Sequence, residues 1–436
     1  MLADPLRIDR LVGQVARAQQ SFLAALHAGR GEDHAFELSG RELSLELLRE
    51  LADATHDPLA PRLLRFAHRL REAYSLLDLD RDHARALRSE HHPIDAPERG
   101  RFTPSMLRVR ALADKPRRAA YLAVLAERAT RATDFALRRA ERRTEHRAGC
   151  ARLVPPDIDL PGPAVIEVAA TALARTSDAY RALAPRTFAD VIELGLGCDS
   201  RAAWPARITT QNLAALFAEA PWLAHVSPDP FPLPAALGAA SHLRALFGFG
   251  AALRVAFSAE AQPFVLARDP YGLERMTFGS LFALLPSNEP FARRRLGVGA
   301  SAFADHRRSL ARVLLVALRS AALRVSLRAP AFSGTQALSR AYTELAHEAL
   351  GVELAPNLLG VLFTPRPADA QRFAAFLLAT SLADRLTQTH DEDWFRNPRA
   401  VDEMRELSRA PVETVAEKAE LERGLDLLVG WLAEGM

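Results

Sequence analysis

Apolar residues recur at intervals of about three to four positions along almost the whole chain. This spacing places them on one face of a helix, whereas the alternation typical of strands and the turn signals of hairpins are nearly absent. A further helix is predicted to begin at Ser39, because Glu42 completes a capping box. The longest predicted helices cover residues 6–26, 62–79, 115–147, 306–327, 335–350 and 369–387. The pattern predicts a mainly α protein with little or no β-sheet.

One proline-rich segment interrupts these helices. Residues 154–163 read VPPDIDLPGP, and this combination of prolines with a glycine excludes a regular helix. The segment predicts a linker between an N-terminal helical lobe, residues 1–153, and a C-terminal helical lobe, residues 164–436. The sequence leaves open the alternative of one continuous domain.

The composition is that of an ordinary globular protein, with 49% hydrophobic residues, 25% charged residues and a net charge of +3. Lys115 and Lys418 are the only lysines, and this preference for arginine, with abundant alanine, leucine and proline, is typical of a GC-rich genome. The N-terminus lacks the apolar core of a signal peptide, and no uncharged apolar stretch reaches the roughly 18 residues of a membrane span. We expect a soluble cytoplasmic protein without a membrane partner.

Few residues suggest nucleophilic or cofactor chemistry. Two cysteines, Cys150 and Cys198, cannot build a disulfide framework or a cysteine-rich metal site, and Asp199 disfavours a thiolate at Cys198. Gly195 and Gly197 lack the third glycine of a dinucleotide-binding loop and are interpreted as turn glycines. The chain contains no GxSxG elbow, P-loop or kinase motif. We therefore expect no cofactor and no catalytic set of these classes.

None of the 13 histidines belongs to an HExxH motif, in which two histidines of one helix face hold zinc. His347 and Glu348 match its first two letters, but Gly351 replaces the second histidine. This predicts a surface His–Glu pair at a helix end. The adjacent His91 and His92 lie in a proline-bounded turn, where their side chains point apart and no third ligand is evident.

Arginines are concentrated in residues 138–147 and invite comparison with a phosphate-binding surface. Glu141 and Glu145 lie within the run at a spacing of four, close to the arginines. This arrangement favours a solvated face of ion pairs. No specific nucleic-acid partner is expected.

Several segments, taken in order, resemble those of one enzyme family. They are residues 173–180, 310–315 followed by 319–327, 341–345 with 348–352, and 392–400, the last containing an acidic-Trp-Phe turn before a short helix. In this order they resemble the oligoendopeptidase F and thimet oligopeptidase type of zinc peptidase. The resemblance implies a two-lobed, helical, zincin-like peptidase fold.

The resemblance also implies a place for the zinc site. In the family, two histidines one helical turn apart and a glutamate from the next helix bind zinc, and the motif's own glutamate is the general base. The first histidine position is occupied here by Gly248, the base by Phe249, the second histidine by Ala252 and the glutamate ligand by Met276. Arg372 falls where the family has a tyrosine that stabilises the oxyanion. These residues give almost no donor that suits zinc.

We therefore expect a catalytically inactive relative, a pseudoenzyme without zinc, that binds a peptide or protein in a retained cleft. One alternative is a divergent hydrolase or other enzyme with metal-free or non-zinc chemistry, using His242, His306 or Arg372. The two histidines are better interpreted as ordinary side chains, partly buried or on a helix surface. Another alternative is a structural partner in an assembly, and the sequence does not indicate an oligomeric state.

Overall fold

The structure is a computed structural model, and it describes the greater part of the 436-residue chain. The described residues are 4–28, 34–54, 56–89, 92–93, 99–100, 116, 119–120, 122–123, 126, 129–154, 162–197, 204, 208–217, 238–258, 262–328, 330–332, 335–411 and 416–436. Most of the predicted linker 154–163, His91, and the pair Cys198 and Asp199 lie outside them. The predicted division into lobes at this linker therefore stays a prediction.

Helices make up nearly all of the regular structure in the described residues, as predicted. The N-terminal helices are α1 (Pro5–Ala28), α2 (Ala35–Gly40), α3 (Leu45–Asp53), α4 (Ala60–Ser75), α5 (Leu77–Ser89) and α8 (Thr130–Cys150). They are followed by α9 (Pro163–Arg175), α10 (Ser177–Ala182), α11 (Phe188–Leu196), α12 (Thr210–Leu216), α13 (Ala239–Ala256), α14 (Phe264–Ala267), α15 (Leu273–Leu284) and α16 (Glu289–Arg295). The last are α17 (Phe303–Ser326), α18 (Thr335–Leu350), α19 (Leu359–Leu362), α20 (Asp369–His390), α21 (Pro398–Arg409) and α22 (Lys418–Gly435). The β-structure described is one antiparallel pair, β1 (His92–Pro93) with β2 (Arg99–Gly100).

The predicted helix start at Ser39 is wrong. Ser39 lies inside α2, where its hydroxyl donates to the carbonyl of Ala35. The cap belongs instead to Ser44, whose hydroxyl accepts a hydrogen bond from the Leu47 amide at 3.1 Å at the start of α3. Two serines thus compete as caps here, and the local pattern favoured the wrong one.

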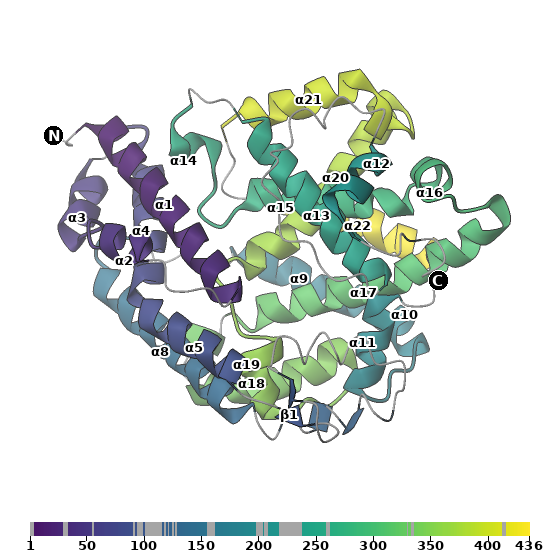
Figure 1. Ribbon diagram of the computed structural model, residues 1–436, viewed down its shortest axis with the longest axis horizontal. Helices are drawn as coiled ribbons and strands as arrows, with labels where there is room; N and C mark the ends of the chain where they lie inside the picture. The colour runs from purple at the N-terminus through teal and green to yellow at the C-terminus, as the bar shows by residue number, and fades with distance from the viewer. Residues whose placement is uncertain are drawn as a thin grey trace.

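Two hydrophobic cores organise the helices. The smaller core is formed mainly by α1, α3 and α4, together with Cys150 and Val154. The larger core is formed mainly by α9, α13, α15, α17, α18, α20 and α22. Figure 1 shows the N-terminal helices α1–α4 together on one side of the molecule and α13, α15, α20 and α22 on the other. No described helix is long and apolar enough to cross a membrane.

Helix α14 connects the two cores. Although α14 follows α13 in the chain, its Val265 is part of the smaller core and Phe264 packs against Phe66 of α4, with ring centroids 5.2 Å apart. The carboxylate of Asp9, buried in α1, accepts hydrogen bonds from the amides of Phe264 and Val265 at 2.8 and 2.9 Å. These two amides start α14, so the carboxylate also neutralises the positive end of the helix.

The long helix α17 carries a buried arginine, Arg319, whose charge is satisfied by hydrogen bonds to neighbouring helices. The guanidinium of Arg319 donates to the carbonyls of Leu173, Glu348 and Ala349, at 2.8, 3.0 and 2.6 Å. These carbonyls lie in the last turns of α9 and α18, where intrahelical donors run out. Arg319 therefore ties three helices of the larger core together.

Candidate functional site

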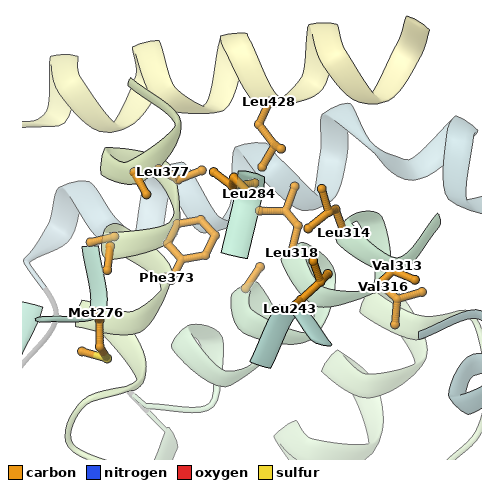
Figure 2. Packing of buried hydrophobic residues seen from close by; sticks show 14 of the residues in the cluster. Leu243, Met276, Leu284, Val313, Leu314, Val316, Leu318, Phe373, Leu377 and Leu428 are labelled. Atoms are coloured by element: carbon orange, nitrogen blue, oxygen red, sulfur yellow. The ribbon is translucent and has the colours of Figure 1, made fainter. Parts of the chain in front are cut away.

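Helices α13 and α15 carry four of the five positions that the family resemblance marks. Gly248, Phe249 and Ala252 lie within two turns of α13, and Met276 lies near the start of α15. Phe249 and Met276 are both buried in the larger core, and Gly248 and Ala252 are partly buried. Figure 2 shows Met276 and Phe373, a buried residue of α20, among the side chains of the larger core.

Two further glycines set how closely these helices cross. A Cβ on Gly250 of α13 would overlap the carbonyl group of Phe278 of α15, and it would also come within 2.7 Å of the Phe282 ring. A Cβ on Gly279 of α15 would come within 2.9 Å of the carbonyl oxygen of Phe247 on α13. Such contacts require glycine, so the two backbones touch where side chains would otherwise separate them. The crossing leaves little room for a bound ion between the helices.

The position assigned to the general base is part of an aromatic cluster. The Phe249 ring is stacked on Phe217 with centroids 4.7 Å apart and an interplanar angle of 2°. Phe282 packs against both rings, and Phe291 packs against Phe217. Phe249 is only 2% exposed, so water has little access to this position.

The residues at these four positions do not fit a zinc ion. Gly248 and Ala252 have no side-chain donor, Phe249 has no basic atom, and the thioether of Met276 is a soft ligand that suits Cu(I) better than zinc. Without nitrogen, oxygen or thiolate ligands, the pKa of a water molecule stays near its bulk value. Hydrolysis by a zinc-bound water therefore has no chemical basis at these four positions.

Charged groups gather beyond the apolar crossing, where α13 ends and α15 begins. Arg254 of α13 and Arg268 each donate a hydrogen bond to the hydroxyl of Ser258 at 2.8 Å. The Asp269 carboxylate accepts from the amides of Tyr271 and Leu273 at 2.8 and 3.2 Å. It thereby fixes the turn that leads into α15.

The ionisation of this group reflects its burial. Burial raises the pKa of Asp269 to about 6, and the negative charge of the nearby Glu274 adds to the shift. Burial lowers the pKa of Arg254 to about 10, although Glu274 opposes this. Both groups are still ionised at neutral pH, so charges persist in the interior.

Arg372 belongs to a second charged group, at the start of α20. The exposed side chains of Arg366 and Arg372 form no ion pair with another residue among those the structure describes. Desolvation lowers the pKa of Arg324 on α17 to about 10; the charge of buried Asp369 opposes this shift, and the charges of Arg366 and Arg372 add to it. The structure thus places Arg372 among arginines, and not in the aromatic cluster around Phe249.

Arginines of α4 and α8 connect the two groups. The positive charge of Arg139 on α8 contributes to lowering the pKa values of both Arg366 and Arg143. The charge of Arg69 on α4 also contributes at Arg143. Arg69 in turn lies 5.6 Å from the ring centre of Tyr271. We call this series the arginine belt; its members are Arg65, Arg69, Arg139, Arg143, Arg254, Arg268, Arg275, Arg324, Arg328, Arg366 and Arg372. The described carboxylates in the same region are fewer than these arginines; they are Glu72, Asp80, Asp269, Glu274 and Asp369.

The belt corrects the prediction that residues 138–147 form a solvated face. Arg138 and Glu141 are exposed, as predicted. Arg143, however, is buried and its Nε lies 2.9 Å from an oxygen of buried Glu72, while Arg139 Nε lies 2.7 Å from Asp80. These partners are about sixty and seventy residues distant in the chain, and the local spacing favoured the nearer glutamates.

The structure brings His242 and His306 together around one aromatic ring. Trp204 stacks on His242 with centroids 4.8 Å apart and lies 5.8 Å from His306. Burial lowers the pKa of His242 to about 4 and lowers that of His306, whose Nε2 lies 3.1 Å from the carbonyl oxygen of Pro286. Both rings are neutral at pH 7 and packed in the interior, an arrangement typical of core histidines.

Two smaller predictions can also be compared with the structure. His347 is exposed in the last turn of α18, and Gly351 follows in a left-handed conformation, as expected for a surface pair at a helix end. Gly195 lies inside α11, so its interpretation as a turn residue is wrong. Gly197 ends that helix with a positive φ of 59°, which agrees with the prediction.

Comparison with known proteins places the fold. No protein-family model and no curated protein sequence matches the chain. Among solved structures, a carboxypeptidase from Pyrococcus furiosus in an apo-Mg form aligns over 100% of this chain and 99% of its own, with a TM-score of 0.54 and 11% identity. PZ peptidase A with an inhibitor aligns over 98% of both chains, with a TM-score of 0.55 and 10% identity. The chain has the fold of these peptidases. The predicted resemblance to a peptidase family is thus confirmed at the level of the fold, and so is the mainly α class.

This peptidase fold extends over the whole chain, since the alignments cover nearly all of it. At about one identical residue in ten, the likeness concerns the fold and not the chemistry. The buried charges of Glu72 and Arg143 and the partly buried charge of Arg139 had no signal in the sequence, because their partners are distant in the chain. The spacing of four between His146 and Cys150 is visible in the sequence, because it places both side chains on one face of a helix.

Proposed function

We propose that this peptidase-fold protein does not hydrolyse peptides through an HExxH-type zinc site, and that it binds an acidic peptide along the arginine belt. The first part is supported by the side chains at the positions that the resemblance assigns to the zinc site. The four positions that the resemblance assigns to zinc and base hold Gly248, Phe249, Ala252 and Met276, and no HExxH motif occurs elsewhere. The tight crossing of α13 and α15 supports it, because restored ligands would meet packed aromatic rings.

The excess of arginine over carboxylate in the belt supports the second part. Burying a guanidinium costs free energy unless a partner compensates. Glu72 compensates buried Arg143. Arg366 and Arg372 are exposed and form no ion pair among the described residues, so their guanidinium groups are accessible to a ligand. A ligand carboxylate would supply this charge through paired hydrogen bonds, the geometry for which a guanidinium is suited. A peptide is the ligand class that the fold favours.

Binding of fluorescent peptides tests this proposal. An acidic eight-residue peptide, its charge-reversed counterpart and inorganic polyphosphate would be titrated with the full chain, with fluorescence anisotropy as the readout for the peptides and competition for polyphosphate. We expect the acidic peptide to bind, with weaker binding at higher salt. Preference for the basic peptide, or no saturable binding of the acidic peptide, would overturn the proposed ligand.

Substitutions identify the surface. The double variant Arg366→Ser/Arg372→Ser removes two exposed charges and should weaken acidic-peptide binding by about tenfold or more, since a hydrogen bond to a charged group contributes about 1.5–3 kcal/mol. The matched control, Arg181→Ser/Arg340→Ser, removes two arginines whose side chains are 76% and 81% exposed on other helices. Equal loss in the two variants would show nonspecific attraction and count against the belt.

A further inference from the structure

Helices α4 and α8 pack against each other and present polar side chains at their contact. His68 and Glu72 lie one turn apart on α4, and His146 and Cys150 lie one turn apart on α8. A spacing of four places both members of each pair on the same helix face. His68 and Cys150 are buried, and His146 is partly exposed.

Three potential metal ligands meet at this contact. One ring nitrogen each from His68 and His146 and the Sγ of Cys150 lie within 4.8 Å of one another. The Sγ of Cys150 is 3.8 Å from Nε2 of His146. The two imidazole rings have centroids 5.2 Å apart and are inclined by 36°. Donors from two helices thus converge on one small volume.

The separation of Sγ and Nε2 is close to the one that a zinc ion requires, and the other ligand atoms, within 4.8 Å, must approach further on binding. Zinc–sulfur bonds of about 2.3 Å and zinc–nitrogen bonds of about 2.0–2.1 Å at tetrahedral angles separate sulfur from nitrogen by roughly 3.6 Å. The observed 3.8 Å between Sγ and Nε2 needs only a small contraction. Imidazole with thiolate also suits zinc and copper better than magnesium or calcium, which prefer oxygen.

The surroundings favour a fixed geometry. One turn away, the ion pair of Glu72 with Arg143 joins the same two helices at 2.9 Å. This ion pair fixes the separation of the helices beside the three ligands, and Glu72 neutralises the charge of buried Arg143 on α8.

We propose that His68, His146 and Cys150 form a three-ligand site for a borderline-soft divalent cation, best matched by zinc, with a fourth coordination position for water. The site lies in the N-terminal helices, away from the α13–α15 crossing, and it does not depend on the function proposed above. The competing interpretation is a thiol and two imidazoles that pack together without binding a metal.

Cobalt substitution distinguishes the two. The full chain, freed of metal by a chelator and reduced, would be titrated with Co²⁺ alone and then with Zn²⁺. We expect one equivalent of cobalt to give visible bands of tetrahedral coordination and a near-ultraviolet thiolate-to-cobalt band, both removed by one equivalent of zinc. Absence of the thiolate-to-cobalt band in the folded wild-type chain would overturn the site.

Variants assign the ligands. Cys150→Ser and His146→Gln should each weaken zinc affinity by more than about 100-fold, because loss of even an outer partner of a metal ligand costs about 10–100-fold. Cys198→Ser, the other cysteine, and His347→Gln, an exposed histidine, serve as controls and should bind as the wild type does. Unchanged affinity in Cys150→Ser, or an equal loss in Cys198→Ser, would contradict the assignment.

A second measurement uses only the wild-type chain and so does not depend on whether the variants fold. In the wild type, zinc should protect Cys150 from alkylation by iodoacetamide, as read by mass spectrometry of its peptide. Equal alkylation rates with and without saturating zinc would contradict thiolate coordination. Copper bound in place of zinc, with the same protection and variant effects, would support the ligand set and correct the metal.

Discussion

Two helix contacts in this molecule have opposite chemistry. At the α13–α15 crossing, Gly250 and Gly279 bring the backbones together and the surrounding side chains are apolar. At the α4–α8 contact, an ion pair and a group of two histidines and a cysteine lie between the helices. The first contact carries the positions that the sequence resemblance assigns to zinc and the general base, and their side chains are Gly248, Phe249, Ala252 and Met276. The second holds three potential ligands at a place that the resemblance does not mark. Fold likeness therefore does not locate the chemistry of this chain.

The largest effect is expected at the α4–α8 contact. Glu72→Gln leaves the Arg143 charge buried without its partner, and breaking a buried ion pair in this way costs about 3–5 kcal/mol of unfolding free energy. Urea denaturation measures the loss. Glu344→Gln, in an exposed pair at 4.0 Å with Arg340, is the control and should cost less than about 1 kcal/mol. Similar small losses in both variants would show that the buried pair does not hold this contact.

A moderate effect is expected at the α13–α15 crossing. Gly250→Ala places a methyl group against the Phe278 carbonyl and should destabilise the fold by about 1–3 kcal/mol through overpacking. Gly430→Ala, in a helix position with nothing within 4 Å, should instead stabilise by roughly 0.5–1 kcal/mol. The same denaturation experiment compares them. A stabilised Gly250→Ala would mean that the helices are not in backbone contact.

The smallest effect at neutral pH is expected for His242 of α13. Burial lowers its folded pKa to about 4 from 6.5, so the unfolded chain binds the extra proton first as the pH falls. The stability from the neutral ring is present above pH 6.5 and is lost as the pH falls toward 4. His242→Phe should keep the stacking on Trp204 and lose this part of the acid sensitivity, as measured by thermal unfolding between pH 4 and 7. Identical pH profiles, or an NMR titration of His242 near 6.5, would restore it as an acid-base candidate.

Much of the fold followed from local patterns. The predicted helices 306–327 and 335–350 correspond to α17 and α18, because their long apolar faces are matched by partners in the larger core. The helix predicted over 62–79 is divided at Leu76 into α4 and α5, and Ser44 replaces Ser39 as a cap. Boundaries such as these depend on competing side-chain hydrogen bonds, to which apolar spacing is insensitive.

The polar interior could not be predicted from local patterns. Arg143 needs Glu72, and His146 with Cys150 needs His68, yet these partners are more than seventy residues earlier in the chain. Sequence spacing shows which residues share a helix face and not which helix that face meets. For the same reason the resemblance could mark Gly248, Phe249, Ala252 and Met276 without revealing how tightly α13 and α15 cross.

The central claim is that this peptidase fold lacks hydrolysis at the α13–α15 crossing, and peptide turnover tests it most directly. The wild-type chain with added zinc, the same sample with a chelator, and Cys150→Ser would be incubated with a peptide library and the products read by mass spectrometry. We predict no cleavage in any sample, including those in which zinc is bound through Cys150. Chelator-sensitive cleavage that persists in Cys150→Ser would contradict the account, because it would require a zinc site other than the one formed by His68, His146 and Cys150.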